Sequence, residues 1–562
     1  MKISSLLMAK LPERRKSAII ANLKKNWYFP LSAMGFFFIN VRLNLGYFLG
    51  IPIAFIAAII ISSQIPSIWA YGKKKPIWLQ VVSILTAAGI CWGELDAFIE
   101  ALLLSPKSQA LLAQYPMLLD LSKIGSILAA VDAVFFVYFF ALLFWEKMLK
   151  IVSASGFFGG VTTTEWIAYG LLIVLALGMM TAVFMQTEAF YETEFTVGIV
   201  CGAIYTGDSP LLVKENAYLS LTNPENDLRQ PLFAVFAAPF IGIPYLIGKL
   251  IGADATGLAI LMNSVQIVML FAAHFMLAKM MKLDSIKRIC FMLLASLTYP
   301  HMLFSLMMEQ YIVAYFWVAF CMYLILEDQP NRMAFYGAGG TLITSMVLLP
   351  LMPGKSPVKC FREWFMEMVR YGVGFVALML VFCRFDVIFN LTQKISLYSY
   401  LSGYEITLMD KVFQYTEFIR DCIAAPNAGV DPTAWGHISW QLNEPTGINF
   451  IGVAILLLAV VSAIWNREKK SSLIAIGWVG FSAVILLLLG WGTTENGLVL
   501  YTLYFGWAFL VLLFQLVEKL ESKLNTRFIL PALSICAAVA LAIINISSIK
   551  EMVHFAISYF PA

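Results

Sequence analysis

The sequence predicts an all-α fold, a polytopic bundle of transmembrane helices with two sizeable loops on its outer face. Hydrophobic residues make up 60% of the 562 residues, and charged residues make up 13%. The apolar residues fall in repeated blocks near the roughly twenty residues that an α-helix needs to cross a bilayer. Because backbone polar groups must be paired inside lipid, we expect these blocks to be helices, about a dozen or more.

The charge and composition of the sequence argue against nucleic-acid binding and against a zinc site. The formal net charge is +4, and the basic residues lie in short clusters between apolar blocks. Such clusters orient membrane helices, and the pattern predicts no nucleic-acid partner. The eight cysteines are scattered singly and the four histidines are far apart, so no zinc-type ligand pattern is present. No cofactor is indicated, and a divalent metal is left open.

Basic flanks favour the cytoplasm and therefore predict the topology of the chain in the cell membrane. The clusters expected inside are Lys24 and Lys25, Lys73 to Lys75, Lys147 and Lys150, Lys282 to Arg288, Arg467 to Lys470, and Lys519 to Arg527. This arrangement places the two long polar segments, 186–230 and 391–448, outside, together with the C-terminus. The expected spans are 26–41, 44–67, 76–95, 124–145, 165–185, 256–279, 289–306, 309–327, 370–389, 449–465, 472–491, 497–517 and 528–546.

Two apolar blocks do not fit this alternation. The block 231–252 contains three prolines, and its crossing would place Lys279 to Arg288 outside, so we expect it to lie in the outer interface. The Gly-rich block 335–352 is either a re-entrant hairpin of half-helices or an ordinary span. In the second case, the charged residues of 353–370 indicate the wrong side of the membrane. The predicted organisation is accessory helices in 1–160, a core in 161–390, an extracytoplasmic loop in 391–448, and C-terminal helices in 449–562.

The loop 186–230 is rich in acids for so hydrophobic a chain: Glu188, Glu192, Glu194, Asp208, Glu215, Glu225 and Asp227, against Lys214 and Arg229. A carboxylate partly desolvated beside a bilayer has a raised pKa, which suits a general base for an incoming hydroxyl. The alternative is that these acids only solvate an ordinary loop.

Two stretches distinguish this loop further. Residues 187–194 lie directly at the outer end of a predicted span and carry three of the acids. Residues 206–210 and 225–232 contain Gly and Pro, which restrict the backbone, and Arg229, whose planar guanidinium can bind a phosphate.

This arrangement resembles the GT-C class of polyprenyl-phosphate-sugar-dependent membrane glycosyltransferases, which includes protein O-mannosyltransferases and lipid A aminoarabinose transferases. The resemblance covers 165–390. It implies that Glu188, Glu192 or Glu194 matches the family's catalytic acid, and that Gln230, Pro231 and Leu232 match its Pro-Pro-Leu step. Glutamates replace the family's usual aspartate-bearing pair, and four spans precede the matching core.

A looser match is an outward turn at Ser296 to Pro300 and His301, followed by Glu309 at the start of the next span. In the family this region borders the lipid-phosphate site. An acid at the edge of an apolar span is also a functional candidate on physical grounds, although acids favour helix N-termini in any protein. The substrate-binding candidates are therefore Arg229, Glu309, Lys214 and His301.

The second outer segment combines aromatic residues with cations: Tyr398, Tyr400, Tyr404, Phe413, Tyr415, Phe418, Trp435 and Trp440, with Lys394, Lys411 and Arg420. Aromatic faces stack on sugars, but such residues more often anchor a loop at the membrane interface. The outer turn 492–496 is placed to close the same cavity from the other side.

The leading hypothesis is an inverting glycosyltransferase that moves a sugar from a polyprenyl-phosphate carrier to a glycan or protein acceptor on the outer face. The candidate bases are Glu188, Glu192, Glu194, Asp208 and Asp227. The alternatives are a transporter or flippase of lipid-linked glycans, which would place ionisable residues at mid-membrane, or a polysaccharide polymerase.

Overall fold

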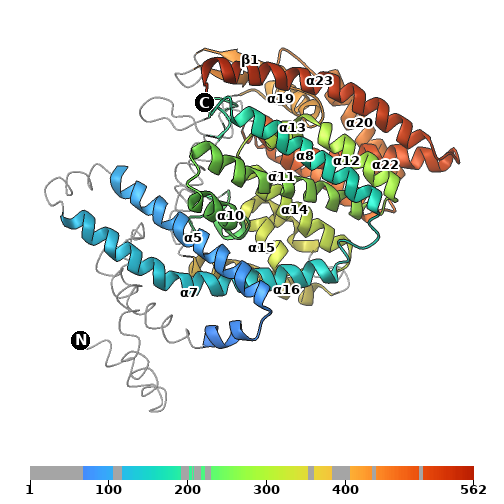
Figure 1. Ribbon diagram of the computed structural model, residues 1–562. Coiled ribbons are helices and arrows are strands. Elements are labelled where there is room, and N and C mark those ends of the chain that lie inside the picture. Colours follow the sequence, from blue (N-terminus) through green and yellow to red (C-terminus); the bar gives the residue numbers. More distant parts are fainter. Residues whose placement is uncertain are drawn as a thin grey trace. The chain divides into compact units, whose positions relative to one another are not determined.

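The computed structural model describes residues 67–104, 117–191, 202–205, 207, 217–221, 229–351, 360–382, 406–432, 438–492 and 498–562. These residues are helical apart from loops and one two-stranded hairpin, as expected for an all-α bundle. The chain divides into two compact units. Unit 1 comprises 1–149, 218–224 and 237–247, and unit 2 comprises 150–217, 225–236 and 248–562. Figure 1 labels the elements.

Unit 1 is built on α5 (Ile77–Leu104) and most of α7 (Met117–Ala154). The Trp145 indole N–H donates to Thr86 Oγ1 at 3.1 Å. The middle of α10 (Phe233–Leu250) also belongs to this unit, and a Cβ at Gly89 of α5 would overlap the backbone of Gly242. Glycine therefore permits the close approach of these two helices.

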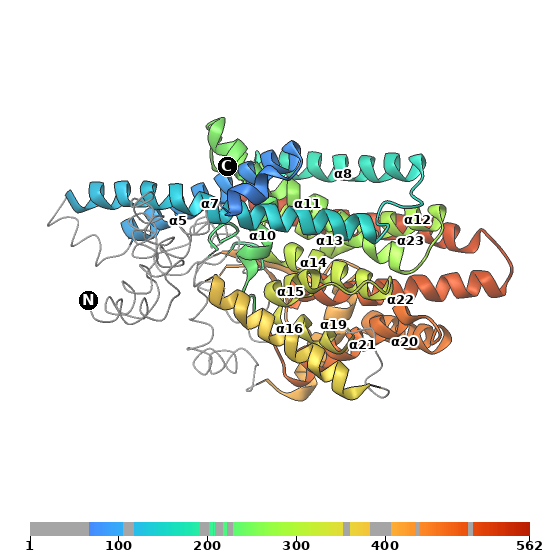
Figure 2. The same ribbon diagram turned by 90° about the horizontal axis from the view of Figure 1, so that it is seen from below.

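Unit 2 contains the long helices α8 (Thr163–Phe184), α11 (Ala255–Met280), α14 (Gln310–Leu326), α22 (Thr502–Lys523) and α23 (Ile529–Tyr559). Helix α11 packs on α8 and α14, and α14 packs on α22 (Figure 1). Figure 2 shows α20 (Phe450–Trp465) and α21 (Lys470–Ser482) packed with α22. The remaining elements are α12 (Ser285–Leu297), α13 (Tyr299–Leu306), α15 (Arg332–Thr341), η1 (Ile343–Leu351), α16 (Phe361–Val381), α19 (Leu408–Asp421), η3 (Ala483–Leu488) and η4 (Leu498–Tyr501).

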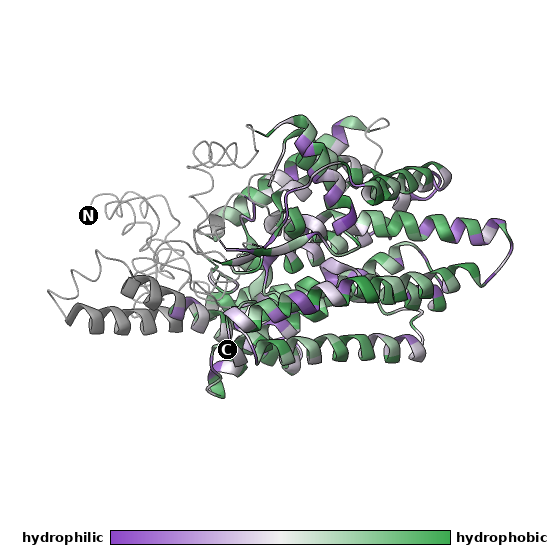
Figure 3. Ribbon diagram, turned by 90° about the horizontal axis from the view of Figure 1, so that it is seen from above, coloured by the Kyte–Doolittle hydropathy of each residue, from purple (hydrophilic) through white to green (hydrophobic). Residues whose placement is uncertain are grey.

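Seven helices in the described residues are long and apolar enough to cross a membrane, or eight if the bent pair α12 and α13 is one span. Hydrophobic residues predominate along most of the coloured helices, and hydrophilic residues lie both at helix ends and within the bundle (Figure 3). Two shorter apolar helices, α14 and α20, add to this set. The chain is therefore a multi-pass membrane protein by helix length and composition, whereas the predicted spans in 26–67 lie largely outside the described residues.

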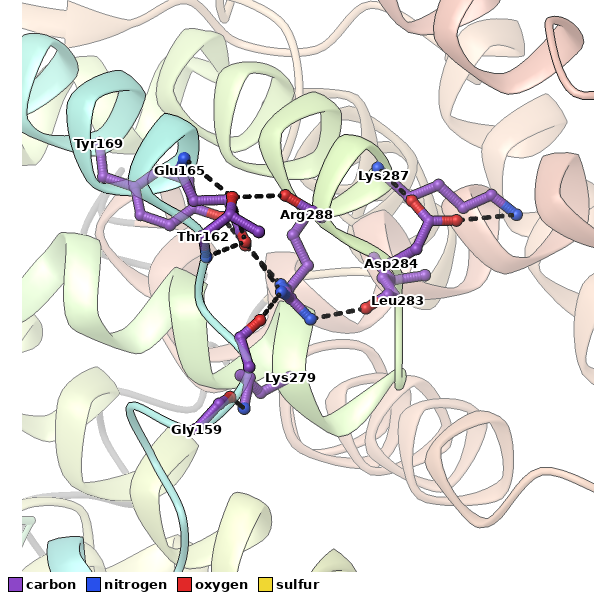
Figure 4. A network of polar contacts seen from close by, with 11 residues as sticks. Gly159, Thr162, Glu165, Tyr169, Lys279, Leu283, Asp284, Lys287 and Arg288 are labelled. Atoms are coloured by element: carbon purple, nitrogen blue, oxygen red, sulfur yellow. Dashed lines mark hydrogen bonds and ion pairs between the residues drawn. The ribbon is translucent and has the colours of Figure 1, made fainter.

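Three of the basic segments predicted to be cytoplasmic meet at one end of unit 2: Lys282 to Arg288, Arg467 to Lys470, and Lys519 to Arg527. Lys287 lies 3.2 Å from Glu521, and Lys469 lies 2.8 Å from Glu518. At the same end, Arg288 makes a bidentate pair with Glu165, with N···O distances of 2.6 and 2.9 Å (Figure 4). The Arg288 guanidinium also donates to the carbonyls of Gly160 and Leu283, so this buried charge is well satisfied.

The expected outward turn at Tyr299, Pro300 and His301 is wrong. These residues form the buried first turn of α13, and the chain bends by 63° between α12 and α13. Proline is favoured in the first turn of a helix as well as in turns, because its missing N–H is not needed there. The chain turns instead at Met307 to Glu309, before α14.

Asn545 of α23 stabilises this bend. Its amide N–H groups donate to the carbonyls of Leu297 at 2.7 Å and Ile423 at 3.1 Å, and its amide oxygen accepts from Ala425 N–H at 2.8 Å. The Ile423 carbonyl also accepts from Tyr299 N–H at 3.1 Å. One fully buried side chain thus satisfies backbone groups on two other segments.

The block 335–352 falls across two short helices, α15 and η1, which are separated at the extended residue Leu342. This division agrees with the half-helix alternative, while re-entry from one membrane face stays a prediction. Helix α10 is continuous and long enough to cross, so its expected interfacial position is likewise untested.

The described part of 391–448 contains α19 and a hairpin of β1 (Ala428–Asp431) and β2 (Ser439–Leu442). The strands are antiparallel, and Val430 pairs with Trp440. Helix α19 begins at Thr407, whose hydroxyl accepts from Asp410 N–H.

Candidate functional site

The described parts of the loop 186–230 converge on the short connection between α13 and α14. At its start, Met308 N–H donates to the Phe190 carbonyl at 3.2 Å. Tyr191 adds a contact to α11, because its hydroxyl lies 2.8 Å from Thr256 Oγ1. The beginning of the loop is therefore held beside Met308, directly before Glu309.

A second part of the loop comprises the described residues 202–205 and 207, and its Gly207 lies against Glu309 itself. A Cβ at Gly207 would overlap Glu309 Oε1 and would lie 2.8 Å from Met307 Cε. Glu309 is fully buried and precedes α14, but its side chain does not cap that helix. Only glycine leaves room for this carboxylate beside the loop backbone.

The strand β2 holds residues 203–205 in place. Tyr205 N–H donates to the Trp440 carbonyl, and Trp440 N–H donates to the Ala203 carbonyl, both at 2.8 Å. The Tyr205 hydroxyl lies 2.6 Å from the Tyr299 hydroxyl and accepts from the Trp440 indole N–H at 3.2 Å. Burial raises the pKa of Tyr205 well above its usual value, so the hydroxyl stays protonated and holds the loop on α13.

The end of the loop reaches the break between α15 and η1. Ile343 N–H donates to the Arg229 carbonyl at 2.7 Å, and Leu232 N–H donates to the Gly340 carbonyl at 2.9 Å. These bonds satisfy backbone groups that the break would otherwise leave unpaired. They also fix Arg229 and Gln230 at the start of α14.

A cavity of about 300 Å³ opens at this place. The cavity is lined by the end of the loop, the starts of α14 and α22, the break between α15 and η1, and residues of and after η3. Its lining residues are Arg229, Gln230, Gln310, Tyr311, Leu342, Ile343, Thr344, Ile485, Leu489, Trp491, Tyr501, Tyr504 and Phe505.

The polar wall of the cavity is an ordered network. The Gln230 amide donates to the Tyr504 hydroxyl at 3.0 Å. That hydroxyl lies within electrostatic range of both the Arg229 guanidinium and the Glu309 carboxylate. The Trp491 indole N–H donates to the Tyr501 hydroxyl at 3.0 Å. A cation, amides and aromatic hydroxyls therefore surround one space, and a buried carboxylate lies close behind.

Another part of the lining is apolar. Ile485 belongs to the π-helix η3, and Leu489 follows it. Leu489 lines the cavity and also exposes 55% of its surface. The cavity lining therefore combines a cation and amides with apolar side chains, one of which is exposed at the protein surface, a combination that suits an amphiphilic ligand.

The residues predicted from the sequence have different places. Arg229 lines the cavity, and Glu309 is buried next to cavity-lining Gln310. Glu188 is half-buried on the segment that ends at Tyr191, and its N–H donates to the Phe560 carbonyl at 3.3 Å. His301 is buried, pairs with His274, and is not among the cavity-lining residues. The remaining candidates lie outside the described residues: Glu192, Glu194, Asp208, Asp227 and Lys214.

Sequence reasoning missed Gln310, Tyr311, Tyr501 and Tyr504, which were counted only as residues of spans. The signal available for them was the run Glu309, Gln310 and Tyr311, where polar groups begin an otherwise apolar helix. Trp491 directly precedes the turn 492–496, most of which lies outside the described residues.

The chain matches no protein-family model, no curated protein and no solved structure. Within the described residues, no three His, Cys, Asp or Glu side chains are grouped to hold a metal ion. The chemistry of the site is therefore argued from its own geometry.

Proposed function

We propose that this chain is a membrane glycosyltransferase that takes a sugar from a polyprenyl-phosphate carrier and transfers it to an acceptor hydroxyl at the end of the bundle opposite the basic clusters. The observation that carries the proposal is the cavity in which Arg229 and two glutamines face tyrosines and an apolar wall. A polyprenyl-phosphate sugar has the three matching parts: an anionic phosphate, a sugar ring and a hydrocarbon chain.

Each part of the donor has a suitable partner in the cavity. The Arg229 guanidinium suits bidentate binding of phosphate. Tyr311 lies with its ring centroid 5.0 Å from that of Tyr504 and 6.0 Å from that of Tyr501, an aromatic surface on which a sugar can stack. The apolar side chains of Ile485 and Leu489 suit the first part of the prenyl chain.

The reaction needs a base and a stabilised leaving group. A carboxylate accepts the proton of the acceptor hydroxyl, the oxygen bonds to the anomeric carbon, and the bond from that carbon to the phosphate oxygen breaks. The phosphate keeps the electron pair beside Arg229, and the configuration at the anomeric carbon inverts. The candidate bases are Glu309, which directly precedes cavity-lining Gln310, and the loop acids Glu188, Glu192, Glu194, Asp208 and Asp227.

The test incubates the purified protein with radiolabelled polyprenyl-phosphate sugars and measures donor binding and the transfer or release of sugar. Arg229→Lys keeps the charge but loses the planar fork, and it should weaken donor binding at least tenfold. Arg467→Lys is the control, because Arg467 is exposed and lies at the basic end of the bundle. Equal donor affinity in both variants and the parent would refute the phosphate site.

Transport of a lipid-linked glycan is the second candidate. Two interrupted segments, η1 and η3, line the cavity, and broken helices around a central site are typical of transporters. Binding of the donor without any transfer or release of sugar, together with its movement across a proteoliposome membrane, would favour this candidate.

A further inference from the structure

One turn of α14 below the cavity, three buried side chains form a continuous chain of hydrogen bonds. The Tyr315 hydroxyl lies 2.8 Å from His274 Nδ1, and His274 Nε2 lies 2.9 Å from His301 Nδ1. The residues come from α14, α11 and α13, and none is more than 5% exposed. Tyr315 follows cavity-lining Tyr311 by four residues and so lies on the same side of the helix.

Among the described residues, the hydrogen-bonding partners of the two imidazole rings carry no charge. In the part of the chain that the structure describes, the two imidazoles contact each other, the Tyr315 hydroxyl and the Phe271 ring, which lies edge-to-face with His301. Two neutral rings avoid an unpaired charge in the interior. Polar side chains that are buried this deeply in a membrane bundle are costly and mark function more often than packing.

Hydrogen-bond chemistry allows two arrangements of the protons on Tyr315, His274 and His301. A neutral imidazole carries one ring N–H, and each contact needs one donor and one acceptor. In the first arrangement Tyr315 donates to His274, and His274 donates through Nε2 to His301 Nδ1. In the second, His301 donates through Nδ1 to His274 Nε2, and His274 donates through Nδ1 to the Tyr315 oxygen. The same heavy-atom positions serve both.

We propose that Tyr315, His274 and His301 form a proton relay that connects the floor of the cavity to α13. When a protonated base or a hydronium ion gives a proton to the Tyr315 oxygen, the Tyr315 proton moves to His274 Nδ1, the His274 Nε2 proton moves to His301 Nδ1, and a water molecule accepts the proton from His301 Nε2. One proton enters, another leaves, and no charge accumulates. The use of this relay, to exchange the proton that the base collects in each turnover, rests on the proposed function.

The test observes the ring nitrogens directly and needs no activity. Protein labelled with ¹⁵N-histidine contains only four histidines, so His274→Gln and His301→Asn assign the two pairs of signals. A relay gives Nδ1 and Nε2 signals averaged between protonated and unprotonated positions in both rings. Fixed, separate signals for both rings in the unmodified protein would overturn the relay.

Tyr315→Phe keeps the aromatic ring and removes the hydroxyl. It should trap the first arrangement, because a bare His274 Nδ1 beside phenylalanine costs less than a buried N–H without an acceptor. The averaged signals should then separate. His554→Gln, on an exposed residue of α23, is the control and should leave them averaged. Signals that stay averaged in Tyr315→Phe would also overturn the proposal.

The two proposals fail separately. Averaged signals in a protein that neither releases nor transfers sugar would refute the glycosyltransferase and leave the relay standing. Fixed signals in an active transferase would refute only the relay.

Discussion

Gly207 and Glu309 are matched to each other: the carboxylate of Glu309 occupies the space that a side chain at position 207 would need. The two residues are far apart in sequence. Their contact joins the acidic loop to the start of α14, where the cavity begins.

Gly207→Ala should therefore disturb the site from a position that carries no functional group. Overpacking of this kind costs about 1–3 kcal/mol, and we expect a lower unfolding midpoint together with weaker donor binding. Gly477→Ala is the matched control, because no heavy atom lies within 4 Å of a Cβ there. In α21 that change should be neutral or stabilising. Equal behaviour of the two variants would contradict the contact.

Removal of single carboxylates should show which one acts as the base, because only that variant should lose most of the transfer rate. We expect one of Glu188, Glu192, Glu194, Asp208, Asp227 and Glu309, changed singly to the amide, to lose about a hundredfold to ten-thousandfold in transfer rate while donor binding persists. Rates are measured at saturating donor, with protein amount checked. Near-normal rates in all six variants would place the base elsewhere.

The two ends of the bundle should lie on opposite sides of the membrane. In a background without native cysteines, Glu444→Cys, an exposed residue after β2, should react with an impermeant maleimide in intact cells. Asn525→Cys, exposed in the basic segment after α22, should react only after permeabilisation. The reverse pattern would invert the topology and remove the proposed acceptor side.

The buried pair of Glu165 and Arg288 should be strongly coupled. Arg288→Met leaves a buried carboxylate alone, and we expect a loss of about 3–5 kcal/mol in unfolding free energy. The double variant with Glu165→Gln should recover much of that loss. Denaturant unfolding of the single and double variants measures the coupling, and strictly additive losses would show that the pair contributes little.

The stability of the protein should depend on pH through Asp421. Burial raises the pKa of this carboxyl from 3.8 to about 7, against the opposing effect of Arg420. Because the folded state holds the proton more tightly, this contribution is complete below pH 3.8 and is lost as the pH rises through 7. Asp421→Asn should flatten the fall in unfolding midpoint between pH 4 and 8, whereas exposed Glu551→Gln should not. An unchanged slope in Asp421→Asn would contradict this assignment.

Several spans could be predicted from sequence because a helix-capping residue precedes the long apolar run. The expected span 165–185 corresponds to α8, which starts after the capping box of Thr162 and Glu165. The expected span 256–279 corresponds to α11, which follows Asp254. Hydrophobic length and caps are local properties, so a single sequence contains them.

The bend and the cavity could not be predicted in the same way. A proline signals a turn or a helix start with the same side chain, and only the packing of Tyr299 and His301 decides between them at Pro300. The cavity brings Arg229, Gln310 and Tyr504 together from separate elements. Composition suggested Arg229 and Glu309 individually, but their proximity depends on tertiary contacts of Phe190, Gly207 and Ile343.

Asn545 also has a consequence for the order of assembly during translation. The Leu297 carbonyl at the bend accepts from a side chain 248 residues further along the chain. While the ribosome is still making the intervening helices, α12 and α13 lack the hydrogen bond from Asn545. We therefore expect the bend to reach its final geometry only after α23 has inserted. Nascent chains arrested before α23 should keep this region open to insertion chaperones and proteases.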